Sequence, residues 1–88
     1  MHIAMAVLLP KWVMRRYFKL RKEFHHKKFT FKEAQETLED DSRIVSLFLS
    51  ELKKAGWLIT EPHPDDVRKR LYQLKYLEAI AKEIEKEL

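Results

Sequence analysis

Residues 41–75 read DSRIVSLFLSELKKAGWLITEPHPDDVRKRLYQLK, and this stretch decides the fold. Apolar residues recur first at i, i+3, i+4 and i+7, which predicts an amphipathic helix over about 42–54. The apolar stripe of that helix is Val45, Phe48, Leu49 and Leu52. Asp41 or Ser42 has the short, oxygen-bearing side chain of an N-cap. Gly56, the only glycine of the chain, stands where helices commonly end in a residue with positive φ.

The residues after this glycine predict a charged β-hairpin. Residues 57–60 read Trp-Leu-Ile-Thr, and such aromatic and β-branched residues are typical of a strand. Pro62 and Pro64 are expected to stop that strand. Residues 70–74 read Arg-Leu-Tyr-Gln-Leu and predict the returning strand. We therefore expect a helix, a strand, a loop over about 62–70 and a second strand.

The composition predicts one small domain with a basic N-terminal part. A chain of 88 residues buries only about two-thirds of its unfolded surface, so oligomerisation would help it. The absence of cysteine excludes disulfides and cysteine-based zinc sites, and fits a cytoplasmic protein. Residues 11–28 carry eight Lys and Arg against one Glu, a balance that suits a polyanion or a solvated helix face. The absence of Asn, with much Lys and Glu, is typical of thermophile proteins.

Residues 1–24 are expected to form an apolar lead-in and a long helix. The lead-in, residues 1–9, is far too short to span a bilayer, which takes about 20 apolar residues. Its positive charges follow the apolar run, so it does not read as a signal peptide. The helix is predicted from about Leu9 to Phe24, with Pro10 in its first turn. Its core stripe is Val13, Tyr17, Leu20 and Phe24.

A short strand and a second helix are predicted before residue 41. Residues 29–31 read Phe-Thr-Phe, an alternation that predicts a short strand able to pair with the hairpin. Thr30 is the expected N-cap of the next helix, and Glu33 completes a capping box. That helix is predicted from Lys32 to Leu38. It is expected to bury Ala34 and Leu38.

A final amphipathic helix is predicted over residues 76–88. Residues 1–24 carry more apolar surface than one packing face needs, and the final helix has no further partner in sequence. Either these two regions cover one another within one chain, or they contact a second copy. The whole of residues 1–88 would form a single domain, with the final helix able to dimerise.

The hairpin resembles a known family. Residues 63–75, HPDDVRKRLYQLK, resemble the wing of MarR-like winged helix-turn-helix proteins, which often reads Asp-Pro-x-Asp-x-Arg and ends in Leu-Thr. The matching positions are Pro64, Asp66, Arg68 and Leu74. His63 replaces the first Asp and Lys75 replaces the Thr. Residues 52–58, LKKAGWL, resemble the usual end of the recognition helix, and residues 9–17 resemble small archaeal winged-helix regulators.

The resemblance implies a mostly α fold with a small β-sheet (α+β), in the order α-β-α-α-β-wing-β-α. It also implies sequence-specific binding of double-stranded DNA by a homodimeric transcriptional regulator, with one helix in the major groove and the wing on the adjacent backbone. Arg43 is suited to guanine O6 and N7, and the wing cations to phosphates. The candidate contacts are Arg43, Ser46, Leu47, Ser50, Lys54, Arg68, Lys69 and Arg70. The dimer would form through residues 1–24 and 76–88.

The alternative function is a winged-helix module that binds protein and not DNA. Glu39, Asp40 and Asp41 precede the recognition helix, where phosphates would approach, and an exposed Leu47 suits a protein contact. In the wing, Arg68 could pair with Asp65 or Asp66 and only hold the loop shape. A continuous positive stripe from the helix to the wing would favour DNA.

Catalysis and cofactor binding are not expected. The histidines have neither the spacing nor the further ligand of a metal site, so we expect no metal. These are His2, His25, His26 and His63. A chain with one glycine has no glycine-rich phosphate loop, and no set of nucleophile, base and orienting group can be assembled. We therefore expect no enzyme activity and no cofactor.

Overall fold

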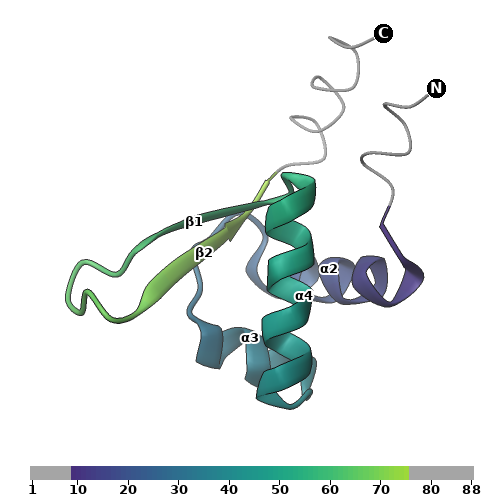
Figure 1. Ribbon diagram of the computed structural model, residues 1–88, viewed down its shortest axis with the longest axis horizontal. Helices are drawn as coiled ribbons and strands as arrows, with labels where there is room; N and C mark the ends of the chain where they lie inside the picture. The colour runs from purple at the N-terminus through teal and green to yellow at the C-terminus, as the bar shows by residue number, and fades with distance from the viewer. Residues whose placement is uncertain (1–8, 76–88) are drawn as a thin grey trace, which may run out of the picture.

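Three helices and a two-stranded antiparallel hairpin make up the computed structural model, which describes residues 9–75 (Figure 1). The elements in chain order are α2 (Lys11–Phe24), α3 (Phe31–Leu38), α4 (Ser42–Ala55), β1 (Leu58–Pro62) and β2 (Arg70–Leu74). The pairing of β1 with β2 runs from Leu58 opposite Leu74 to Pro62 opposite Arg70. The predicted α+β class is therefore confirmed. The predicted helix over 76–88 and residues 1–8 of the predicted lead-in over 1–9 lie outside the described residues.

Side-chain caps begin α3 and α4 where the sequence predicts them. The Thr30 hydroxyl accepts the N–H of Glu33 at 3.2 Å, and the Glu33 carboxylate accepts the N–H of Thr30 at 2.9 Å. This is the reciprocal capping box. Asp41, and not Ser42, caps α4, because its carboxylate accepts the N–H of Ile44 at 2.9 Å. Gly56 ends α4 with φ +82°, a conformation that other residues adopt at a cost.

The first helix starts two residues after the predicted start at about Leu9. The helix begins at Lys11, because Pro10 has an extended ψ of 152° and acts as the N-cap. The carbonyl of Pro10 accepts the N–H groups of Val13 and Met14, each at 3.0 Å. Pro10 therefore precedes the first turn of the helix by one residue, whereas the sequence predicts it within that turn.

The predicted strand over 29–31 pairs with the hairpin as expected, but only at Phe29. Phe29 forms one isolated bridge to Tyr72, with two backbone hydrogen bonds of 2.8 Å, and the pairing goes no further. Phe31 is already the first residue of α3, because the capping bonds of Thr30 turn the chain into a helix there. In the hairpin, β1 begins at Leu58 and includes Pro62, its last residue, where a proline is tolerated.

The hydrophobic core lies between α2, α3, α4 and the base of the hairpin. Its buried residues are Val13, Tyr17, Leu20, Phe29, Ala34, Leu38, Val45, Phe48, Leu49, Leu52, Trp57, Leu58 and Leu74. The predicted apolar stripes of α2 and α4 thus form the core, except that Phe24 is only partly buried. Truncating one of these large side chains to alanine costs about 2–5 kcal/mol of stability. Among residues 9–75, no helix is long and apolar enough to cross a membrane.

Candidate nucleic-acid interface

The outward side of α4 carries four of the predicted contacts. The core stripe of this helix faces α2, so the opposite side is open to solvent. Arg43, Ser46, Leu47 and Ser50 are exposed there, and with Ser42 and Phe31 they line a shallow depression. This surface offers one guanidinium, two hydroxyls and a leucine that is 51% exposed. These groups can donate hydrogen bonds to base edges or make contact with a methyl group.

The wing loop, residues 63–69, is shaped by short-range hydrogen bonds. Asp66 accepts the backbone N–H of Arg68 at 3.0 Å, and its carbonyl accepts the N–H of Lys69 at 3.0 Å. The N–H of His63 closes the loop on the carbonyl of Lys69 at 3.1 Å. The backbone N–H of Arg68 is the main reason that the pKa of the Asp66 carboxyl lies below its ordinary value. An ionised Asp66 therefore holds the wing turn, as Asx residues do.

Arg68 pairs with Asp66, as one of the two sequence hypotheses proposed. Its Nε lies 3.4 Å from the carboxylate. The side chain of Arg68 is nevertheless 88% exposed, so most of the guanidinium projects into solvent. A loop-shaping contact and an outward charge are thus combined in one residue.

The wing cations gather in a cleft against the start of α3. Arg68, Lys69 and Arg70 line it together with Lys32 and His63. The remaining lining residues are Thr30, Phe31 and Tyr72. Four Lys and Arg side chains in one cleft make a positive surface that suits phosphate groups.

A third depression joins the wing cleft to the outward side of α4. It is lined by Ser46, Ser50 and Lys53 of α4 and by Arg70 and Tyr72 of β2. Phe31 lines this depression, the wing cleft and the α4 depression alike. Seven of the eight predicted contacts therefore lie along one connected surface, which we call the α4–wing surface.

The eighth predicted contact, Lys54, is placed differently. Its ammonium lies 3.7 Å from the carboxylate of Glu51, and it lines none of the three depressions. Lys53 faces the hairpin in its place, and Lys32 joins the wing cleft from α3. Neither Lys53 nor Lys32 was among the predicted contacts. Lys53 lies seven residues after Ser46 on the same side of the helix, and this spacing is the signal that would have found it.

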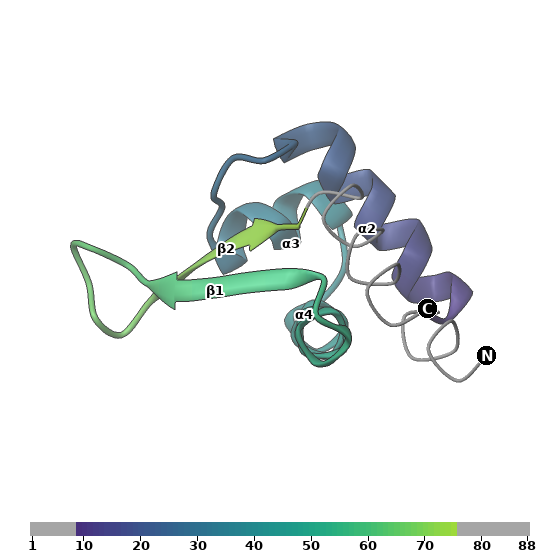
Figure 2. The ribbon, with the colours of Figure 1, turned by 90° about the horizontal axis from the view of Figure 1, so that it is seen from above.

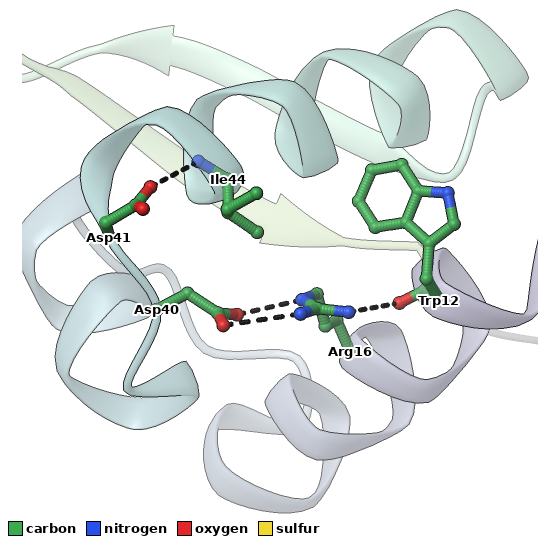
Figure 3. Close-up of polar contacts among 5 residues, drawn as sticks. All are labelled: Trp12, Arg16, Asp40, Asp41 and Ile44. Atoms are coloured by element: carbon green, nitrogen blue, oxygen red, sulfur yellow. Dashed lines mark hydrogen bonds and ion pairs between the residues drawn. The ribbon is translucent and has the colours of Figure 1, made fainter.

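Two of the three acidic residues before α4 are engaged by other groups (Figure 3). Arg16 of α2 donates from Nε and from a terminal nitrogen to the Asp40 carboxylate, at 2.8 and 3.3 Å. The other terminal nitrogen of Arg16 donates to the carbonyl of Trp12 at 3.0 Å, and the guanidinium lies 5.6 Å from the Trp12 ring centre. Asp41 caps α4, as described above. Glu39 is exposed at the end of α3.

The described residues contain no group of three acidic, histidine or cysteine side chains that could hold a metal ion. His63 points into the wing loop, where its Nδ1 accepts the N–H of Asp65 at 3.1 Å. His25 and His26 lie in the connection after α2, far from His63 in sequence. The chemistry of the α4–wing surface is therefore that of hydrogen bonds and positive charge.

Solved structures resemble this chain, although no protein-family model and no curated protein sequence matches it. A cysteine-to-serine mutant of MarR from E. coli matches with a TM-score of 0.66 and 20% identity, over 97% of this chain and 61% of that one. The same mutant complexed with operator DNA matches with a TM-score of 0.66 and 22% identity, over 89% and 54%. BpsR from Bordetella bronchiseptica, whose DNA binding is regulated by 6-hydroxynicotinic acid, also matches. Its TM-score is 0.63 and its sequence identity 17%, over 98% of this chain and 72% of that one.

The fold is the winged helix of MarR. In this arrangement α3 and α4 form the helix-turn-helix, and β1, β2 and the loop between them form the wing. The chain spans 54–61% of the length of the MarR chains that it matches. At these identities the likeness establishes the fold, and the function must be argued from the α4–wing surface.

Proposed function

We propose that this chain binds double-stranded DNA in a sequence-specific way and acts as a small transcriptional regulator. The outward side of α4 would enter the major groove, and the wing would lie on the adjacent backbone or minor groove. Arg43 would read a guanine edge, Ser46 and Ser50 would contact bases or phosphates, and Leu47 would contact a thymine methyl group. Arg68, Lys69 and Arg70 would bind phosphates and set the register without reading sequence.

The observation that supports this proposal is the continuity of the α4–wing surface. A positive stripe from the recognition helix to the wing is what distinguishes a DNA surface from a protein-binding one. Phe31 and Arg70 bridge the two parts, Lys53 adds charge between them, and Lys32 adds charge in the wing cleft. Asp40, which would repel phosphates, is neutralised by Arg16. A MarR structure of the same fold is complexed with operator DNA, which supports DNA as the partner.

A homodimer through residues 1–24 and 76–88 is part of the proposal. Two copies would place two recognition helices about one DNA turn apart and favour a palindromic site. Most of the proposed contact region lies outside residues 9–75, so its support comes from the sequence. Phe18, on the outward side of α2, is the one large apolar residue of that region that the structure describes as exposed.

The experiment is a titration of the purified protein against a random-sequence duplex at about 50 and 200 mM salt, because phosphate contacts release counterions and make affinity salt-dependent. The mass in solution is measured in parallel. We expect binding that weakens steeply with salt, by roughly threefold or more for each phosphate contact. A folded protein that binds no duplex at the lower salt concentration would contradict the proposal.

A protein partner is the second candidate function, and one observation favours it. Leu47 is 51% exposed in the centre of the outward side of α4, where a thymine methyl or an apolar protein side chain could cover it. Replacement of Leu47 by Gln separates the two candidates. If DNA is the partner, the variant keeps its salt-dependent duplex binding, because the phosphate contacts are untouched.

A further inference from the structure

The outward side of α2 is a second basic surface that the proposed DNA contacts do not use. Lys11, Arg15, Lys19 and Lys22 are exposed there, at intervals of three or four residues. Within the described part of the chain, none of these four takes part in an ion pair. They span about 16 Å along the helix at 1.5 Å per residue. We call these four residues, with Phe18, the α2 surface.

The α2 surface faces away from the α4–wing surface. In α2, the side that packs in the core consists of Val13, Tyr17 and Leu20. The four cations are on the opposite side of the same helix, by the 3.6-residue period. Since α4 also turns its apolar stripe to this core, the two helices present their charged sides in different directions. Figure 2 shows α2 and the wing loop at opposite ends of the domain.

A groove runs beside α2 toward the end of α3. It is lined by Arg15, Arg16, Phe18, Lys19, Lys22, Leu38 and Asp40. Asp40 is its one acidic residue, and Arg16 satisfies that carboxylate with two hydrogen bonds. The groove therefore keeps three cations that no acidic group of the described residues neutralises.

The chemistry of this surface fits a nucleic-acid backbone better than a membrane or a protein. An amphipathic helix at a membrane inserts its apolar side, whereas the apolar side of α2 is buried in the core. Protein interfaces are depleted of lysine, but three of these four cations are lysines. Single-stranded nucleic acid is bound by several stacking rings, and Phe18, 47% exposed, is the one ring here.

We propose that the α2 surface binds the phosphate backbone of a second DNA duplex, so that one protein bridges two DNA segments. This proposal rests on the proposed function, because the α4–wing surface must hold the first duplex. It also requires that the homodimer contact, formed by other parts of residues 1–24 and by residues 76–88, leave these four cations exposed. The four cations would act as point charges on phosphates, without reading bases. Bridging should therefore be independent of sequence and should decrease steeply as salt increases.

The test uses two random-sequence duplexes, one fixed to beads and one fluorescent in solution. The full chain at about 50 mM salt should retain the fluorescent duplex on the beads. The variant R15Q/K19Q/K22Q removes three exposed charges without touching the core. We expect its affinity for a single duplex to stay within about twofold, while capture of the second duplex falls about tenfold or more.

A matched variant removes three charges from the other surface. The affinity of R68Q/K69Q/R70Q for a single duplex should fall, whereas that of R15Q/K19Q/K22Q should not. The charge-preserving variant K19R/K22R should capture the second duplex like the unaltered protein. Circular dichroism and mass in solution are measured for every variant, so that loss of folding is separated from loss of binding.

Several outcomes would overturn the bridging role. One is unchanged capture by R15Q/K19Q/K22Q. Another is an equal loss of single-duplex affinity in both triple variants, which would place α2 in the first footprint. If R15Q/K19Q/K22Q changes the mass in solution, the α2 surface is a contact between copies. If the unaltered protein binds anionic vesicles and this variant does not, the α2 surface binds a membrane. If the unaltered protein binds no duplex, the proposed function itself fails; if it binds one but never bridges, only the second surface fails.

Discussion

At the start of α4, Arg16 and Asp40 share two hydrogen bonds between side chains that are 25% and 21% exposed, whereas in the wing Arg68 reaches Asp66 from a side chain that is 88% exposed. The first contact joins residues 24 positions apart and ties α2 to the turn before α4 (Figure 3). The second joins residues two positions apart inside one loop. Both contacts are Arg–Asp pairs, yet they differ in what they hold in place.

This difference indicates how the two parts of the α4–wing surface would work. A half-buried pair with a fork geometry fixes the direction of a helix, which suits contacts to base edges. A loop held by local bonds can adjust to a backbone, which suits contacts to phosphates. Exposed pairs contribute little to global stability, because water and salt screen them.

The largest effect is expected where the contact is half-buried. Asp40→Ala leaves the Arg16 guanidinium without its carboxylate and should cost about 2 kcal/mol of stability. For a domain of this size, the midpoint of thermal unfolding should fall by roughly 8–16 °C. The matched wing variant Asp66→Ala should leave that midpoint nearly unchanged. Equal midpoints for Asp40→Ala and the unaltered protein would remove the distinction between the two contacts.

Arg43→Ala should have the next largest effect, on sequence preference. A guanidinium paired with guanine contributes about 1–3 kcal/mol of discrimination against the wrong base. After selection of a preferred site, the variant should lose affinity for that site and keep its affinity for random duplexes. A similar loss on every sequence would assign Arg43 to the phosphate backbone.

The double variant R68A/K69A should weaken binding to all sequences alike. Loss of two phosphate contacts reduces the slope of log affinity against log salt by about 2. Between 50 and 200 mM salt, the decrease in affinity should therefore be about tenfold smaller than in the unaltered protein. An unchanged slope would remove these two wing residues from DNA binding.

The smallest effect concerns the pH dependence of the wing. The pKa of the Asp66 carboxyl is lowered, chiefly by the backbone N–H of Arg68, so the ionised form stabilises the wing at neutral pH. This stabilisation is present above the ordinary carboxyl pKa of about 3.9 and is lost as the pH falls through the lowered value. The amide resonance of Arg68 should report it by NMR. In Asp66→Asn, that resonance should lose its acidic titration step.

The sequence was sufficient for elements that follow local rules. The helix over 42–54, its glycine end and the returning strand were predicted because an apolar period, a lone glycine and a charged loop stand in one stretch. The strand over 29–31 is reduced to one bridge at Phe29, because the capping box of Thr30 prevailed over the aromatic alternation. The Arg16–Asp40 pair was missed because only the packing of α2 against α3 brings these residues together. The contribution of Phe31 to all three depressions was missed for the same reason, because it depends on how α3 packs beside α4 and the hairpin.

The most direct test of the α4–wing surface is an amide chemical-shift map of the labelled protein during titration with a short duplex. At less than one duplex per protein, we predict shifts over residues 42–50 and 66–70 and at Lys32, while Lys11 to Lys22 stay unchanged. The α2 residues should shift only when a second duplex is added in excess. Shifts confined to α2, or spread evenly over the domain, would contradict the account.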